Sequence, residues 1–153
     1  WDGVLNSAKF YERRAQLRNE GKITLAPARL EDHFDRDAID RLNLIIDSTG
    51  CFIVVTSGHR NTFKTVEDLR AFAASIGIRS DAVWDRTPVR AWRSQEVSDY
   101  LATFGKLESW AVVDDAFGPL DGFDESRVVF TDKQTGLLDV HVDELVRILN
   151  NWC

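Results

Sequence analysis

The apolar and polar positions after residue 34 alternate between helical and strand spacing. Four apolar residues recur at helical spacing: Ile39, Leu42, Ile45 and Ile46. Asp35 is a candidate N-cap for this helix, and Gly50 stands just past its expected end. Residues 51–55 then form a nearly continuous apolar run, which is typical of a strand buried on both faces of a sheet.

The same alternation continues to the end of the chain. We expect a second helix between Thr65 and Gly77, a third capped by Ser94, and a closing helix over 142–149. Shorter apolar runs predict strands at 82–84, 110–113 and 128–130. Such alternation implies right-handed crossovers and a parallel sheet covered by helices on both faces. The predicted fold class is therefore α/β, with a Rossmann-like, doubly wound parallel sheet in a single domain over 1–153.

Residues 6–34 do not follow this rhythm. They combine a polar, arginine-bearing stretch, a Gly21-Lys22 break and an Ala26-Pro27 segment. We expect them to form a small insertion, a helix and a loop, over the active face.

Composition narrows the class of protein. The 153 residues suffice for one domain, and 44% hydrophobic with 29% charged residues is ordinary for a globular protein. A net charge of -6 argues against strongly electrostatic binding of nucleic acid, although local arginine clusters remain. No membrane span or signal-peptide pattern is visible, and the two cysteines lack metal-binding spacing, so a reduced, cytoplasmic setting is expected.

The first five residues resemble the end of a longer motif. Residues 1–5 read as the tail of Asp-x-Asp-Gly-Val-Leu, whose first aspartate would precede Trp1. The sequence contains no methionine and no apolar run ahead of this motif. We therefore expect the first aspartate and the central first strand of the sheet to lie upstream, and a chain truly beginning at Trp1 to be unfolded.

Polar side chains follow several of the predicted strands. Asp2 follows the expected first strand, Thr56 and Ser57 follow 51–55, and Asp114 and Asp115 follow 110–113. Ligands of open α/β sheets bind beyond these carboxyl ends, so the side chains should converge. Converging carboxylates repel one another unless a hard cation lies between them, and such oxygen ligands suit Mg²⁺.

Six short strings occur in the order of a known family. They are residues 2–6, 53–60, 87–88, 93–97, 112–115 and 131–137. With them the chain resembles the haloacid dehalogenase (HAD) superfamily of phosphohydrolases from Asp2 to about Leu149. Within it, the chain is most similar to the small, nearly capless phosphatase domains of Swiss Army Knife RNA repair proteins. The resemblance implies a HAD core in which the insertion 6–34 replaces a large cap.

The resemblance also implies roles for individual residues. The aspartate expected before Trp1 would attack phosphorus and become an aspartyl-phosphate. Asp2 would act as general acid and then general base, and its backbone carbonyl would bind Mg²⁺. Asp114 would bind Mg²⁺ directly, and Asp115 directly or through water.

The remaining roles concern the phosphoryl group. Thr56 would hydrogen-bond it, helped by backbone N–H groups of Ser57 and Gly58, and Arg93 would offset its charge. His59 and Arg60 adjoin this loop as candidate substrate contacts. Two choices stay open: Arg90 competes with Arg93, and Ser57 competes with Thr56. The family more often has lysine at the position of Arg93, and arginine keeps the charge but changes the geometry.

These residues together predict a Mg²⁺-dependent phosphomonoesterase. The resemblance and the short insertion suggest a phosphorylated RNA or DNA end as substrate, such as a 3′-phosphate. One alternative is a phosphate-binding pseudoenzyme without turnover, if the upstream residue is not aspartate. A phospho-accepting receiver domain is the other, but there the acidic pair follows the first strand, whereas Asp114 and Asp115 come late.

Overall fold

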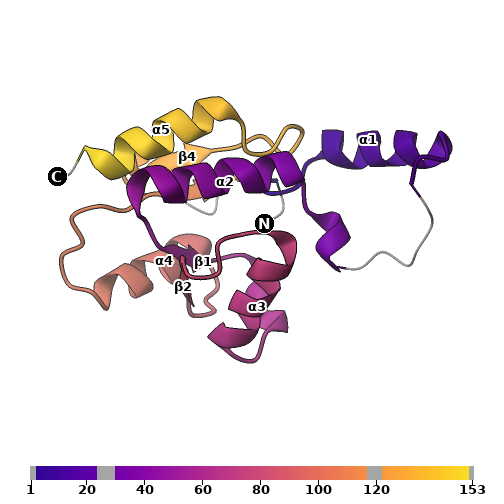
Figure 1. The fold of residues 1–153 in the computed structure, drawn as a ribbon. Coiled ribbons are helices and arrows are strands. Elements are labelled where there is room, and N and C mark those ends of the chain that lie inside the picture. The colour runs from indigo at the N-terminus through magenta and orange to yellow at the C-terminus, as the bar shows by residue number, and fades with distance from the viewer. Residues whose placement is uncertain (1–2, 24–29, 117–121, 152–153) are drawn as a thin grey trace.

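The computed structural model describes residues 3–23, 30–116 and 122–151, which form a mixed α/β fold (Figure 1). The predictions made for Trp1, Asp2 and Cys153 fall outside these residues. Helices alternate with short strands along the described chain, and the named strands pair in parallel. The α/β class inferred from the apolar pattern is therefore confirmed.

Helix α2 (Arg36–Thr49) begins and ends where the sequence predicts. The Asp35 carboxylate accepts a hydrogen bond from the Asp37 N–H at 3.1 Å, which satisfies one of the free donors at the helix start. Gly50 ends the helix in the left-handed conformation, with φ 66°. Four of its residues are buried: Ala38, Ile39, Ile45 and Ile46.

Helix α3 (Val66–Ile76) is held at its start by a capping box. The Asp68 N–H donates to Thr65 Oγ1 at 3.1 Å, and the Thr65 N–H donates to the Asp68 carboxylate at 3.0 Å. Gly77 ends the helix with φ 92°, as predicted. Local chemistry thus sets both ends of α3, and its buried face packs against β2.

The strands form two parallel pairs. Strand β1 (Ile53–Val55) pairs with β2 (Val83–Arg86), and β3 (Val112–Asp114) pairs with β4 (Val128–Phe130). Each pair is a separate two-stranded sheet in the described part of the chain. Strand β1 is shorter than the apolar run suggested, because Phe52 precedes it and is 63% exposed beside Trp84.

A single large core connects the elements. Helices α2 and α5 (Asp139–Asn150) lie side by side, and α5 also packs against β4 (Figure 1). The most deeply buried side chains of this core come from distant parts of the sequence: Leu5, Ile39, Leu69, Val83, Val129 and Leu137. A smaller cluster joins Val97 to Val112 and Val128.

The predicted insertion contains helix α1 (Ala8–Asn19) and a 3₁₀ turn, η1 (Leu30–His33). Helix α1 has no buried residue and lies at one end of the molecule (Figure 1). Backbone bonds from Ala8 and Lys9 to the carbonyls of Lys133 and Gln134 attach its start to the loop after β4. Its arginine-bearing face is therefore solvated.

Helix α4 (Arg93–Ala102) differs from expectation at its start. Trp92 is the N-cap residue and makes no side-chain capping bond, so the predicted Ser94 cap is wrong. The helix begins at Arg93, two residues before the start that a Ser94 cap would give. Both Arg93 and Glu96 therefore lie in its first turn. No helix in the described ranges combines the length and apolarity needed to cross a bilayer.

The capping box predicts a measurable stability effect. Thr65→Ala removes the hydroxyl that accepts from the Asp68 N–H and should lower the free energy of unfolding by about 1 kcal/mol. Thr65→Ser keeps that hydroxyl and should retain most of the stability. Urea denaturation of the intact protein measures both variants, and equal losses would contradict a capping role.

Candidate active site

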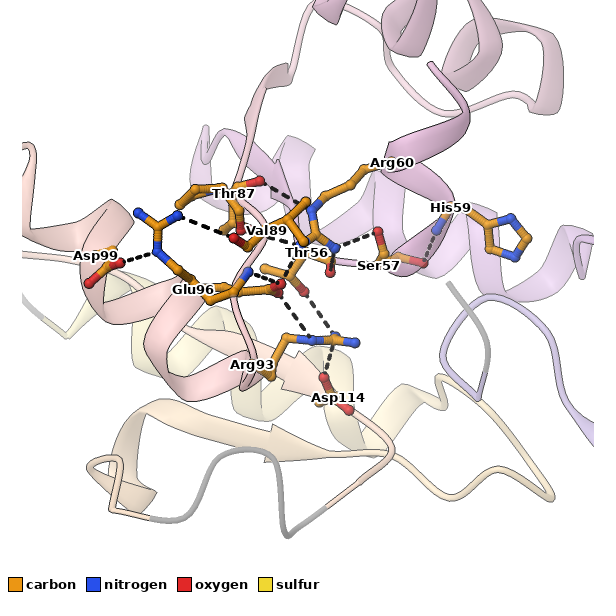
Figure 2. Close-up of polar contacts among 12 residues, drawn as sticks. Thr56, Ser57, His59, Arg60, Thr87, Val89, Arg93, Glu96, Asp99 and Asp114 are labelled. Atoms are coloured by element: carbon orange, nitrogen blue, oxygen red, sulfur yellow. Dashed lines mark hydrogen bonds and ion pairs between the residues drawn. The ribbon is translucent and has the colours of Figure 1, made fainter. Parts of the chain in front are cut away.

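The segment that follows β1 forms a tight polar loop. Thr56 and Ser57 lead into the 3₁₀ turn η2 (Gly58–Thr62), and Ser57 Oγ accepts from the His59 N–H at 3.4 Å. The Ser57 hydroxyl therefore caps this turn. The Thr56 hydroxyl instead contacts Arg93, as Figure 2 shows.

Arg93 connects the ends of two strands from different sheets. Its Nη1 donates to Thr56 Oγ1 at 3.1 Å and to Asp114 Oδ2 at 2.7 Å (Figure 2). Thr56 follows β1, and Asp114 is the last residue of β3. Three residues that the sequence singled out, 58 positions apart at the extremes, thus meet at one point.

Asp114 is a carboxylate that the protein buries at a cost. It is 5% exposed, and burial raises the pKa of its carboxyl, an effect that the Arg93 guanidinium partly offsets. Its Oδ1 also accepts from the Ala116 N–H at 3.1 Å. A buried carboxylate with a raised pKa beside a cation is the kind of group found at functional sites.

Asp115 lies against the backbone of the Asp-Gly motif. A Cβ atom built on Gly3 would stand 2.2 Å from Asp115 Oδ2, and Gly3 has φ +68°. Only glycine therefore fits here, for two independent reasons. The Gly3 carbonyl also accepts from Thr131 Oγ1 at 2.8 Å, which ties the start of the chain to the end of β4.

These contacts bear on the predicted Mg²⁺ site. Asp115 brings a carboxylate next to the backbone of Gly3, whereas the Asp114 carboxylate is bound to Arg93 and to the Ala116 N–H. Carboxylate oxygens are donors that suit a hard cation. No group of three potential ligands occurs among residues 3–23, 30–116 and 122–151. Asp2, the predicted third contributor, falls outside those ranges, so Mg²⁺ binding by Asp2, Asp114 and Asp115 stays a prediction.

Arg60 occupies the interior rather than the surface. It is 3% exposed, and all five of its N–H donors have acceptors within the protein. One donates to Glu96 Oε1 at 2.5 Å. The other four donate to the backbone carbonyls of Thr56, Ser57, Thr87 and Pro88. No donor remains for a phosphate, so the geometry does not support the substrate contact expected of Arg60.

The structure also distinguishes between the two candidate arginines. Arg90 Nε donates to Asp99 Oδ2 at 2.6 Å, on the flank of α4, whereas Arg93 reaches Thr56 and Asp114. Similarly, Thr56 joins this contact while the Ser57 hydroxyl is used as a cap. The geometry favours Arg93 over Arg90 and Thr56 over Ser57.

His59 and Gly58 adjoin this loop in different ways. The His59 ring points away from the Arg93–Asp114 pair in Figure 2. A Cβ atom on Gly58 would meet nothing within 4 Å, so the space beside this backbone is open. Gly58 therefore leaves room for a ligand near the loop, and His59 stands at its outer side.

Two buried residues were not predicted as part of the site. Glu96 is 6% exposed and pairs with Arg60, and Thr87 is 4% exposed with a hydroxyl that has no hydrogen-bond partner among the described residues. The spacing of Arg93 and Glu96, three residues apart on one helix, was the available signal for Glu96. Thr87 stood in the family string 87–88, but that string assigned it no role.

Comparison with protein-family models identifies a match over residues 1–142, to the family described as the HAD domain in Swiss Army Knife RNA repair proteins. Searches of curated proteins and of solved structures found no match. The family match spans all the residues that meet around Arg93, and it agrees with the resemblance carried by the six sequence strings. The chain belongs to the HAD superfamily, in the family of HAD domains of Swiss Army Knife RNA repair proteins.

Proposed function

We propose that this chain is a Mg²⁺-dependent phosphomonoesterase that acts through an aspartyl-phosphate. Membership of the HAD family supports a phosphatase or a related activity. The observation that carries the proposal is the meeting of Thr56 and Asp114 on the Arg93 guanidinium, with Asp115 against Gly3. A hydroxyl, a cation and two carboxylates at adjoining strand ends are the groups that phosphoryl transfer requires.

In this proposal each residue has one task. Thr56 donates a hydrogen bond to the phosphoryl oxygens, and Arg93 balances their negative charge. The aspartate expected before Trp1 attacks phosphorus, while Asp2 protonates the leaving oxygen and later removes a proton from water. Asp114 and Asp115 would hold Mg²⁺, which supplies charge stabilisation for the transferring group.

The two strand pairs fit one larger sheet. We propose that β1–β2 and β3–β4 are halves of a doubly wound sheet, joined through the expected first strand. The support is that Arg93 bridges Thr56, just after β1, and Asp114, at the end of β3. In such a sheet the carboxyl ends of both pairs would lie at the same edge, where ligands of open α/β sheets bind.

For the substrate, we propose a phosphorylated nucleic-acid end, such as a 3′-phosphate. Support comes from the small insertion, whose helix α1 has no buried residue, and from the name of the family, which refers to RNA repair proteins. Arginine clusters support it less than the sequence suggested. Arg86 donates to the carbonyls of Arg60, Phe63 and Lys64, and Arg90 pairs with Asp99.

Phosphate release tests the proposed activity. The intact protein is assayed on an RNA 3′-phosphate, a sugar phosphate and an aryl phosphate, with Mg²⁺ or a chelator. We expect release that requires Mg²⁺, is fastest on RNA, and is abolished by Asp114→Asn. Asp99→Asn makes the same change on the flank of α4 and should leave the rate unchanged.

Either part of the proposal can fail separately. Release from the sugar phosphate, with none from RNA, would reject the nucleic-acid substrate but would still support a phosphatase. No release from any substrate by a folded protein would favour the pseudoenzyme without turnover.

The two arginines of this region should respond differently to substitution. Arg93→Gln removes the cation beside Thr56 and Asp114 and should lower kcat roughly a hundredfold or more. Arg93→Lys keeps the charge and should lose less, because one of the two bonds can persist. Arg90→Gln should change kcat less than about twofold, since Arg90 pairs with exposed Asp99. Steady-state kinetics decides between them, and a larger loss for Arg90 would reverse the assignment.

The raised pKa of Asp114 predicts how stability depends on pH in the presence of a chelator. Folding favours the neutral carboxyl, so its contribution is complete below the unfolded pKa and is lost as pH rises through the folded pKa. Asp114→Asn cannot ionise. The melting temperature of this variant, relative to the parent, should therefore increase between about pH 4 and pH 7. A constant difference across this range would contradict the raised pKa.

A further inference from the structure

Glu96 is a buried carboxylate that touches neither Thr56 nor Asp114. It lies in the first turn of α4 and is 6% exposed. A buried carboxylate is tolerated only where cations or hydrogen-bond donors surround it. Its position beside the candidate active site raises the question of what these partners are.

The two oxygens of Glu96 face different arginines. Oε1 accepts from Arg60 Nη2 at 2.5 Å and from the Arg90 N–H at 3.1 Å. Oε2 lies 3.8 Å from Arg93 Nε, an ion-pair distance on the same helix. Figure 2 shows the Glu96 carboxylate between the Arg60 and Arg93 guanidinium groups. One buried side chain therefore connects both arginines.

On one side, this contact orients Arg60. The Arg60 guanidinium binds the carbonyls of Thr56 and Ser57 after β1 and those of Thr87 and Pro88 after β2. These four carbonyls belong to the two loops that border the site. Through Arg60, Glu96 is linked to the backbone that carries the Thr56 hydroxyl.

On the other side, the contact holds the near end of Arg93. The Arg93 side chain is long and 29% exposed. Holding it in one rotamer costs conformational entropy. Its Nε faces Glu96, while its Nη1 reaches Thr56 and Asp114. Two attachments along one guanidinium restrict its direction far more than one would.

The charges of the group also balance. Arg60 and Arg93 are positive and Glu96 and Asp114 are negative, so the formal charges cancel. Without the negative charge of Glu96, the Arg60 guanidinium would lose its carboxylate partner, and no opposite charge would lie between it and the Arg93 guanidinium. Like charges would then repel, and Arg93 would be displaced from its present contacts.

We propose that Glu96 is a positioning residue, which holds Arg60 and Arg93 so that the Thr56 hydroxyl and the Arg93 guanidinium keep the spacing that binds a phosphoryl group. The inference rests on the proposed function for its kinetic consequences, though not for its structural ones. Glu96 itself does not contact the substrate. Its removal acts on the reaction through the placement of Arg93 and of the loop that carries Thr56.

Kinetics of a double-mutant cycle tests this mechanism. Glu96→Gln should lower kcat about tenfold to a hundredfold, as expected when a reacting group is misplaced by about an ångström. In the Arg93→Gln background, the same substitution should lower kcat by a clearly smaller factor, because only the link through Arg60 to the Thr56 loop is still lost. Asp99→Asn, which removes an exposed carboxylate from the same helix, is the matched control and should change neither rate. Fully additive losses, or an unchanged rate in Glu96→Gln, would overturn the proposal.

A second measurement does not depend on turnover. Inorganic phosphate binding, measured by calorimetry in the presence of Mg²⁺, should weaken about tenfold or more in Glu96→Gln and in Arg93→Gln, but not in Asp99→Asn. If the parent releases no phosphate from any substrate, the proposed function fails, and this binding comparison still decides the positioning role. Equal phosphate affinity in Glu96→Gln and the parent would reject it.

Misfolding of the glutamine variant would not prevent a decision. Glu96→Asp keeps the charge but shortens the side chain, and should shift the NMR resonance of the Arg93 Nε–H, assigned by its loss in Arg93→Lys. The Nε–H of Arg79, which pairs on the surface with Asp47 and Asp81, is the reference and should stay unchanged. An unmoved Arg93 resonance would show that Glu96 does not hold this side chain.

Discussion

The buried Arg60 guanidinium is the constraint on which the rest of the site depends. Its five donors join the loops after β1 and β2 to the first turn of α4 through Glu96. A buried guanidinium with unfilled donors is strongly unfavourable, so the loops must take the shape that supplies the acceptors. The loop carrying Thr56 is thus shaped by a buried residue whose donors are all bound within the protein.

The ion pair between Arg93 and Asp114 is the second constraint on the site. Burial alone disfavours the ionised form of Asp114, and Arg93 opposes this by lying 2.7 Å away. The same guanidinium donates to Thr56, so one cation binds a side chain at a strand end of each sheet. Thr56 follows a strand of one pair and Asp114 ends a strand of the other, so neither strand pair holds both groups by itself.

Local chemistry made much of the fold predictable. Asp35, Thr65, Gly50 and Gly77 set helix ends through bonds or backbone angles within a few residues, and the structure confirms all four. The predicted Ser94 cap was wrong because α4 begins earlier, at Arg93. Arg93 and Glu96 in this first turn make tertiary contacts that a local sequence pattern does not show. The exposed Phe52 shows the same limit, since apolar runs indicate burial only on average.

The candidate site was predictable in its residue types but not in their tasks. Strand-end placement pointed to Thr56 and Asp114, and they meet. Arg60 was expected to contact substrate, but its donors all have acceptors within the protein, because proximity in sequence to the loop after β1 does not show which way a long side chain turns. The choice between Arg90 and Arg93 also needed the structure, since both lie near the start of one helix.

The bond between the Gly3 carbonyl and Thr131 Oγ1 spans 128 positions of the sequence. Together with the close fit of Gly3 on Asp115, it means that the Asp-Gly motif acquires its final neighbours only from the last third of the chain. During synthesis on the ribosome, Gly3 is made before Asp115 and Thr131, the residues that contact it. A nascent chain that ends before residue 131 therefore lacks the hydroxyl that binds the Gly3 carbonyl, so this part of the fold can form only late in synthesis.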